Sequence, residues 1–244
     1  MKPIIVIPAR LESTRLPCKP LLRINGKAMI RHTVERVLKG GIEPVAVASD
    51  AQIVLDEISD VPGVIPVLTA VDHNCGTERV LEAYRILSEQ QGDFDIIINV
   101  QGDEPFIDPD LIKALPEELE KRKEQAQFWT TVTDITEDEK ADRNVAKVVL
   151  DLKQNALIFT RDPIACAYKH TSIYIYTPDF LQLFCSLPSS PLEKAYSLEQ
   201  MRALDNGYRL NCIPLPFDAI SINTREDLAK AGISDYQFHT DLKK

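Results

Sequence analysis

The first half of the 244-residue sequence alternates short apolar runs with longer segments of helical periodicity. The apolar runs are rich in Val and Ile and occupy residues 4–7, 45–48, 64–68 and 96–100. The helical segments lie at residues 29–38, 51–58, 77–89 and 108–123. Strands that are apolar throughout and separated by helices are typical of a parallel sheet covered on both faces. The alternation therefore predicts an α/β fold with a mainly parallel sheet.

After residue 125 the alternation gives way to strand-like segments with shorter connections. These segments lie at residues 128–135, 146–150, 157–160, 172–177, 208–214 and 219–222. Helical patterns remain at residues 178–184, 192–205 and 225–231. We interpret this half as a mixed or antiparallel extension of the first sheet, within a single domain of residues 1–244. Residues 233–244 have no strong pattern and are predicted to form a tail.

Composition disfavours several classes of protein. The formal net charge of −9 argues against general nucleic-acid binding, which needs clustered cations. No pair of the five cysteines has CxxC spacing, so neither a zinc site nor a disulfide framework is expected. No apolar stretch approaches the roughly 20 residues that span a bilayer, and no signal-peptide pattern precedes the first strand. We expect a cytoplasmic protein without membrane insertion or a nucleic-acid partner.

A basic segment follows the first predicted strand, at residues 8–20. It carries three cations, Arg10, Arg15 and Lys19, in a chain that is acidic overall. Ligands of open parallel sheets bind at the carboxyl ends of the strands, and guanidinium and ammonium groups suit a triphosphate. The segment is not a Walker loop, because it lacks glycine and its lysine precedes proline. It predicts a triphosphate-binding loop, and a solvated loop is the alternative.

Two further segments lie beside predicted strand ends. In Gln101-Gly102-Asp103, the carboxylate is placed to hold a hard cation such as Mg²⁺, and the glycine permits close approach of the backbone. An acidic turn that caps the next helix is the alternative. Residues 74–79 open a helix, where backbone donors can face a base or a phosphate. Plain capping by Thr77 explains that segment equally well.

Together the three segments resemble the 3-deoxy-manno-octulosonate cytidylyltransferases, which make CMP-KDO for lipopolysaccharide. The resemblance extends from Ile5 to about Lys230. It is most specific at residues 10–21, 24–27, 76–79 and 99–105, with further matches at residues 145–151, 192–193 and 198–202. It implies a Rossmann-like nucleotidyltransferase sheet, CTP as donor, Mg²⁺ as cofactor and a homodimer. It also implies a nucleotide-binding half at about 1–125 and an acceptor-binding and dimerisation half at about 126–232.

The resemblance implies a role for residues in both halves. Those implied in catalysis are Arg10, Arg15, Lys19 and Asp103. Those implied in nucleotide binding are Pro8, Ala9, Arg10, Cys75, Gly76, Arg79 and Gln101. Those implied in acceptor binding are Arg161, His170, Tyr174, Glu199 and Gln200. The implied metal ligands are Asp103 and Asn223.

The departures from the family pattern fall mainly on the acceptor side and at the second metal position. Asn223 replaces the family's second metal-binding Asp, and an Asn carbonyl ligates Mg²⁺ without bringing charge. Alternatively, Asn223 caps the helix that begins near residue 225. Segments 160–165 and 170–175 also differ, and Cys18 replaces a common glycine. Without the resemblance, His170 and Tyr174 would be interpreted as a satisfied pair on a strand.

The resemblance implies transfer of CMP from CTP to an acidic 3-deoxy sugar, KDO or a close relative, for lipopolysaccharide or surface-glycan biosynthesis. The anomeric hydroxyl would attack the α-phosphorus, and pyrophosphate would leave. One alternative is the same reaction on another ulosonic acid or a phosphonate. A second alternative is a catalytically impaired nucleotide-binding regulator, with Asn223 as the lesion.

Overall fold

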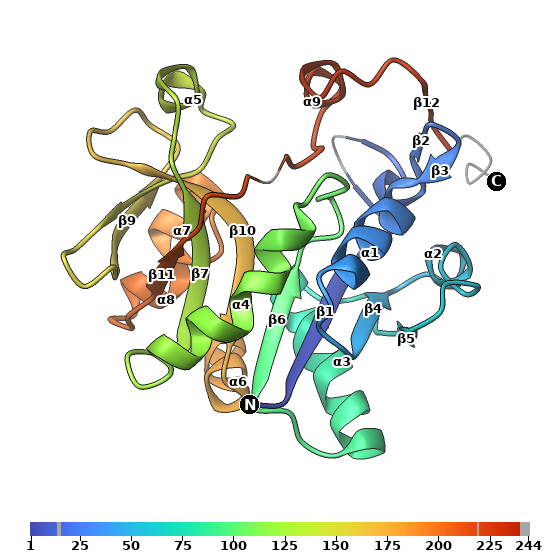
Figure 1. The fold of residues 1–244 in the computed structure, drawn as a ribbon, viewed down its shortest axis with the longest axis horizontal. Helices are drawn as coiled ribbons and strands as arrows, with labels where there is room; N and C mark the ends of the chain where they lie inside the picture. Colours follow the sequence, from blue (N-terminus) through green and yellow to red (C-terminus); the bar gives the residue numbers. More distant parts are fainter. Residues whose placement is uncertain (14–15, 219, 240–244) are drawn as a thin grey trace. The chain divides into compact units, whose positions relative to one another are not determined.

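The computed structural model of the protein describes residues 1–13, 16–218 and 220–239 (Figure 1). The chain divides into two compact units. Unit 1 comprises Met1–Lys113 and Ala219–Lys244, and unit 2 comprises Ala114–Asp218. The sequence suggested a division near residue 125, whereas the structure divides the chain at residue 113 and returns the last segment to unit 1.

Unit 1 contains the predicted parallel strands. They are β1 (Pro3–Ala9), β4 (Val45–Ser49), β5 (Val64–Leu68) and β6 (Ile96–Val100). Their pairings with one another are parallel, in the order β6-β1-β4-β5. Every residue of β4 and β6 is buried, as the continuous apolar runs predicted. Because the strands are parallel, their carboxyl ends meet at one edge of the sheet.

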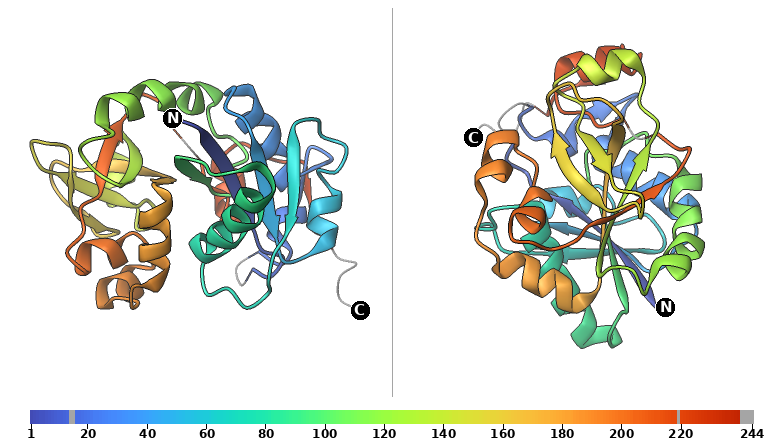
Figure 2. Two further views of the ribbon diagram at one scale, coloured as in Figure 1. Left: turned by 90° about the horizontal axis from the view of Figure 1, so that it is seen from below. Right: turned by 90° about the vertical axis from the view of Figure 1, so that its left-hand side faces the viewer.

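Helices cover both faces of this sheet. They are α1 (Met29–Lys39), α2 (Gln52–Asp56) and α3 (Gly76–Gln91), and α4 (Pro109–Arg122) follows β6. The chain moves outward from β1 to β5 and then returns through α3 to β6. Right-handed crossovers therefore place α1 and α3 on opposite faces, as Figure 1 and Figure 2 show.

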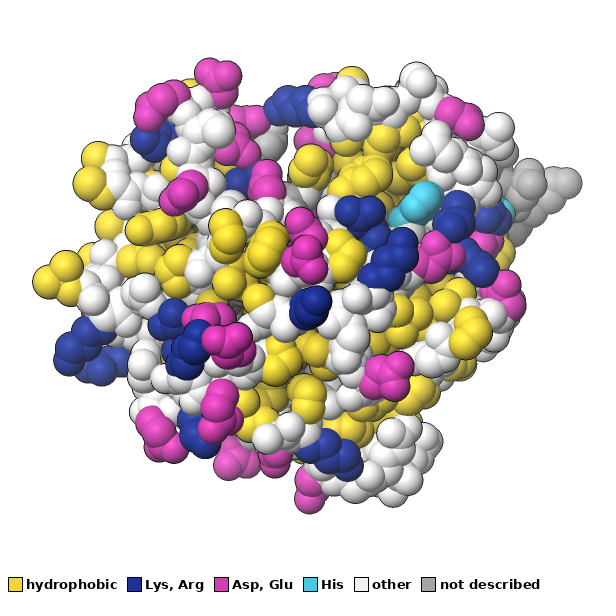
Figure 3. Space-filling view, viewed as in Figure 1, with side chains coloured by type: hydrophobic (Ala, Val, Ile, Leu, Met, Phe, Trp, Pro, Cys, Tyr) yellow, Lys and Arg dark blue, Asp and Glu magenta, His cyan; other side chains and the backbone are white. Residues whose placement is uncertain are grey.

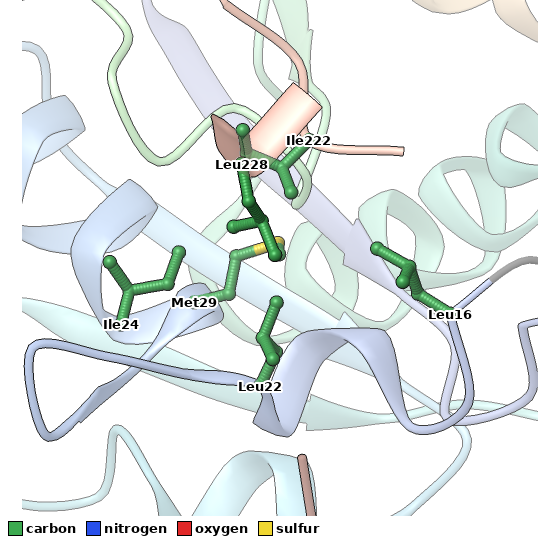
Figure 4. Packing of buried hydrophobic residues seen from close by; sticks show 6 residues of the cluster. All are labelled: Leu16, Leu22, Ile24, Met29, Ile222 and Leu228. Atoms are coloured by element: carbon green, nitrogen blue, oxygen red, sulfur yellow. The ribbon is translucent and has the colours of Figure 1, made fainter. Parts of the chain in front are cut away.

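A small second sheet in unit 1 uses residues that the sequence assigned to a tail. It pairs β2 (Arg23–Ile24) with β3 (Lys27–Ala28) and with β12 (Tyr236–Gln237). The tail prediction is wrong over these residues because Tyr236 and Phe238 pack against a buried apolar cluster. The side chains of this cluster, shown in Figure 4, are Leu16, Leu22, Ile24, Met29, Ile222 and Leu228. Residues 240–244 lie outside the described residues.

Unit 2 contains the predicted antiparallel strands. They are β7 (Phe128–Thr133), β8 (Lys147–Leu150), β9 (Ala156–Thr160), β10 (Tyr168–Tyr176) and β11 (Asn211–Pro214). Strand β10 is antiparallel to β7 and β8, β8 is antiparallel to β9, and β11 is parallel to β7. The sequence missed the short helix α5 (Glu137–Ala141), which a Thr136/Glu139 capping box begins.

Two predicted elements were wrong. The single helix expected at 192–205 is two helices, α7 (Pro191–Tyr196) and α8 (Met201–Asp205), which follow α6 (Pro178–Ser186). Ser197 ends α7 in the left-handed conformation at φ 52°, where its N–H donates to the Glu193 carbonyl. In the strand expected at 219–222, residues 220–222 form no ladder, and Ala219 lies outside the described residues.

The aromatic core of unit 2 makes a quantitative test of the packing. Phe128 is fully buried, and its ring centroid lies 4.6 Å from that of Tyr176 and 5.3 Å from that of Phe180. We expect Phe128→Ala to lower the free energy of unfolding by about 3–5 kcal/mol, because the cavity adds to the lost burial. Leu152→Ala is the control, since Leu152 is fully exposed and should change it by less than about 0.5 kcal/mol. If urea unfolding gave equal changes in the free energy of unfolding for the two variants, this packing would be contradicted.

Candidate active site

Three residues that the sequence singled out meet in unit 1. Lys19 Nζ lies 2.5 Å from Asp103 Oδ2 and 3.1 Å from Asn223 Oδ1. The side chains of Lys19 and Asp103 retain 17% and 21% of their exposure, so the ion pair is partly shielded but reachable. The ammonium group of Lys19, in the segment after β1, therefore joins Asp103, which follows β6, to Asn223, which precedes α9 (Arg225–Lys230).

Apolar packing explains why these three segments meet. Leu16 and Leu22, which flank Lys19 in the chain, belong to the cluster of Figure 4. Ile222 belongs to the same cluster, and its N–H donates to the Asp103 carbonyl at 2.9 Å. Burying these neighbours fixes the backbone on which Lys19 and Asn223 stand.

Asn223 is not the cap of α9. Thr224 is the N-cap, and it forms a reciprocal capping box with Asp227. The Asp227 carboxylate also accepts the backbone N–H of Asn223 at 2.8 Å. The Asn223 amide is thus left to face Lys19 rather than the helix, which removes the capping alternative.

Glycine at position 102 allows β1 and β6 to end close together. A Cβ atom on Gly102 would lie 2.9 Å from the carbonyl oxygen of Pro8 and 3.4 Å from Cβ of Ala9. Real Cβ atoms essentially never approach backbone oxygen so closely, so a side chain would force the strand ends apart. The close approach places Asp103 directly beside the end of β1.

A second group of expected residues surrounds the start of α3. A Cβ on Gly76 would lie 3.6 Å from Pro8 Cγ and 3.8 Å from Gln101 Oε1, so these three positions adjoin one another. The N-cap of α3 is Cys75, and Thr77 lies inside the helix, which excludes plain capping by Thr77. The Gln101 amide donates to Asn99 Oδ1 at 3.0 Å, and this contact orients the Gln101 side chain.

Arg79 lies in the interior. Its side chain is 3% exposed, and its guanidinium donates to Asp50 Oδ2 at 3.0 Å and to the Ala70 carbonyl at 3.1 Å. It also donates to Thr69 Oγ1 at 2.5 Å. Contact of Arg79 with a nucleotide stays a prediction. No role was predicted for Asp50, although it lies one residue after a buried strand, where ligands of parallel sheets bind.

The structure describes only one of the two remaining cations of the basic segment. Arg10 is exposed directly after β1, where it can reach a ligand, whereas Arg15 lies outside the described residues. No role was predicted for Glu104, which is 1% exposed and whose carboxylate accepts from the Ser221 hydroxyl. No local sequence pattern predicts that contact, because the two residues lie 117 positions apart.

The expected acceptor residues lie in unit 2. Tyr174 donates its hydroxyl to Gln200 Oε1 at 2.8 Å, which joins β10 to the residue before α8. His170 is 5% exposed, and its Nε2 lies 2.7 Å from the Thr130 hydroxyl. Burial, and then the charge of Arg161, lower the pKa of His170 to about 3, so its imidazole is neutral at physiological pH.

Two more expected acceptor residues are held by backbone contacts. Arg161 donates to the carbonyl of Tyr196 at 2.8 Å and to that of Asn144 at 2.8 Å. The carbonyl of Glu199 accepts the N–H of Arg202 at 3.1 Å, beside the buried Gln200. Acceptor binding by these residues stays a prediction.

We also searched the described residues for metal-binding groups, membrane-spanning helices and basic patches. Across residues 1–13, 16–218 and 220–239, no three His, Cys, Asp or Glu side chains form a metal-binding group. Within the same part of the chain, every helix is too short or too polar to cross a membrane. On the face seen in Figure 3, Lys and Arg are interspersed with Asp and Glu rather than gathered in one basic field.

Comparisons with known proteins place this geometry in a family. The cytidylyltransferase family model matches residues 4–210. The 3-deoxy-manno-octulosonate cytidylyltransferase of Paramagnetospirillum magneticum is 40% identical and covers 95% of this chain and 96% of its own length. The 8-amino-3,8-dideoxy-manno-octulosonate cytidylyltransferase of Shewanella pealeana is 38% identical and covers 92% and 94%.

A solved structure agrees with the sequence relatives. It is that of CMP:2-keto-3-deoxy-manno-octonic acid synthetase complexed with CTP, and it superposes with a TM-score of 0.82 at 36% identity. The match covers 95% of this chain and 97% of the other. The resemblance predicted from the sequence is thereby confirmed, and the chain belongs to the cytidylyltransferase family.

Proposed function

We propose that the protein transfers CMP from CTP to 3-deoxy-manno-octulosonate or a close relative and releases pyrophosphate. The observation that carries this proposal is the convergence of Lys19, Asp103 and Asn223 at the carboxyl ends of parallel strands in a cytidylyltransferase. Relatives named for an octulosonate and for its 8-amino derivative have nearly the same identity to this chain. They support the acceptor class, and the acceptor within it is left to experiment.

The reaction needs no protein nucleophile. The anomeric hydroxyl oxygen forms a bond to the α-phosphorus of CTP, the bond from that phosphorus to the β-phosphate oxygen breaks, and the hydroxyl proton is released. Lys19 and Arg10 neutralise charge on the triphosphate, while Gly76 and Gln101 border the base and ribose. Positioning and charge neutralisation then supply the rate acceleration, as in phosphoryl transfer generally.

Mg²⁺ fits the oxygen donors of this site. The Asp103 carboxylate and the Asn223 amide oxygen converge on one point, and Mg²⁺ is commonly held by one or two such ligands together with phosphates and water. When bound, the ion would neutralise phosphate charge. Lys19, which bonds both oxygens in this structure, would exchange them for phosphate oxygens when the nucleotide binds.

The proposal extends to the setting of the enzyme. A homodimer in the cytoplasm that serves lipopolysaccharide or surface-glycan biosynthesis is what the family resemblance implies. The mixed charges in Figure 3 and the net charge of −9 favour small anionic substrates that are bound locally over nucleic acid.

A pyrophosphate-release screen tests the proposed reaction. Each nucleoside triphosphate is combined with KDO, its 8-amino derivative, another ulosonic acid and a phosphonate. We expect CTP to be preferred over ATP, GTP and TTP, with turnover on KDO or its 8-amino derivative. Comparable rates with several triphosphates would contradict base recognition near Gly76 and Gln101. Tight CTP binding without pyrophosphate release on any acceptor would instead favour a nucleotide-binding regulator.

The basic segment after β1 gives a second prediction. Lys19→Ala should lower kcat/KM by roughly 30- to 1000-fold, equivalent to about 2–4 kcal/mol, because a charged partner of the triphosphate is lost. Arg15→Ala should act similarly, although Arg15 lies outside the described residues. Lys39→Ala is the matched control, since Lys39 is exposed at the end of α1. Wild-type turnover of Lys19→Ala would remove this segment from the site.

The metal assignment gives a third prediction. Asp103→Ala should abolish Mg²⁺-dependent turnover, because it removes the carboxylate beside the phosphates. Asn223→Asp should lower the Mg²⁺ concentration at half-maximal rate, since a second charged oxygen attracts a hard cation. Asn25→Asp adds the same charge at an exposed turn and should leave the titration unchanged. An unchanged midpoint in Asn223→Asp would leave Asp103 as the only assigned ligand.

A further inference from the structure

A buried carboxylate joins the basic segment to the interior of unit 1. Asp50 comes directly after β4, and its Oδ1 accepts the backbone N–H of Leu11 at 3.0 Å. Its Oδ2 accepts from Arg79 Nη2 at 3.0 Å. The side chains of Asp50 and Arg79 retain only 12% and 3% of their exposure, so solvent screens this ion pair weakly.

The Arg79 end of this contact is fixed. Arg79 stands in the second turn of α3, and its other terminal nitrogen bonds the Thr69 hydroxyl and the Ala70 carbonyl. Thr69 is itself tied to the sheet, because its N–H donates to the Ser49 carbonyl at 2.9 Å. These contacts therefore hold the guanidinium of Arg79 in one position between β4, β5 and α3.

The Leu11 end is where the chain leaves the sheet. Ala9 and Ser49 are partners in the β1–β4 register, so Asp50 stands beside Arg10 just past the ladder. Further along the segment, Leu16 is buried in the apolar cluster of Figure 4. Between the sheet and that cluster, the Asp50 carboxylate holds the backbone of the segment at Leu11.

We propose that Asp50 is a positioning residue, which locks the start of the cation-bearing segment after β1 to the buried Arg79 and so pre-arranges Arg10 for the triphosphate. This inference rests on the proposed function, because it requires that segment to bind CTP. It also gives Arg79 a role that needs no contact with the nucleotide. The same contact couples the helix start at Gly76 to the phosphate-binding segment.

The chemistry of the site calls for a carboxylate. Two donors approach from different sides, and Asp50 offers each one an oxygen. An amide offers a single acceptor oxygen, so Asp50→Asn can serve Leu11 or Arg79 but not both. It also leaves the buried guanidinium without a charged partner.

The experiment compares Asp50→Asn with Asp95→Asn. Asp95 likewise accepts a backbone N–H next to β1, that of Lys2 at 2.6 Å, but at the opposite end of the strand. We expect Asp50→Asn to raise KM for CTP about 10- to 100-fold, because the phosphate-binding groups are misplaced, and to leave KM for the sugar unchanged. Trypsin should also cleave the native Asp50→Asn protein faster after Arg10. Asp95→Asn should change neither readout.

A second pair of variants covers the case in which Asp50→Asn does not fold. Leu11→Pro deletes the N–H donor, fixes φ at position 11 and leaves the Asp50–Arg79 pair in place, whereas Leu11→Ala keeps the donor. We expect Leu11→Pro to raise KM for CTP and Leu11→Ala to leave it near the wild-type value. A normal KM for CTP in Leu11→Pro, or in a folded Asp50→Asn protein with reduced thermal stability, would overturn the inference.

Lys19→Ala, measured in parallel, separates this inference from the proposed function. Impaired Lys19→Ala together with normal Asp50→Asn would overturn only the role of Asp50. Wild-type turnover in Lys19→Ala would overturn the phosphate-binding segment and, with it, the purpose assigned to Asp50. The combined Asp50→Asn/Lys19→Ala variant should lose less than the product of the two single effects, because both act through one segment.

Discussion

The parallel pairing of β1 with both β4 and β6 is the constraint on which the candidate site depends. It brings the carboxyl ends of three strands to one edge, where each strand gives way to a polar segment. The contacts that follow act over short distances: Gly102 against Pro8, Asp50 against Leu11, and Asp103 against Lys19. These residues are far apart in the sequence, and the strand pairing is what brings them together in space.

Much of unit 1 could be predicted from the sequence because β1, β4 and β6 are buried almost throughout and are therefore apolar runs. The same logic located Lys19 and Asp103 at strand ends. It could not locate Asp50 as a partner of Arg79, because a long-range ion pair leaves no local pattern. Nor could it foresee the break at Ser197, since a left-handed serine has no periodicity. The sequence did not predict β12, because Tyr236 packs against a cluster whose other members are mostly far away in the chain.

The role of the polar residues of unit 2 was harder to predict, for a physical reason. A buried polar side chain on a strand can serve a ligand or merely satisfy its neighbours, and both cases give the same alternation. His170 shows this ambiguity, since burial keeps its ring neutral while Thr130 occupies one nitrogen. Tyr174 likewise donates its hydroxyl to Gln200, a contact that needs no ligand. Their expected part in acceptor binding therefore rests on family resemblance, whereas the nucleotide-binding residues expected in unit 1 also rest on converging charges.

The substitution of an amide at position 223 changes the electrostatic balance of the donor half. One ammonium and one carboxylate cancel, and the Asn223 amide adds no charge, so the trio of Lys19, Asp103 and Asn223 is neutral as a whole. A second carboxylate there would make the trio anionic and would repel a triphosphate until a cation arrived. The amide at position 223 therefore adds no repulsion of its own toward the proposed triphosphate.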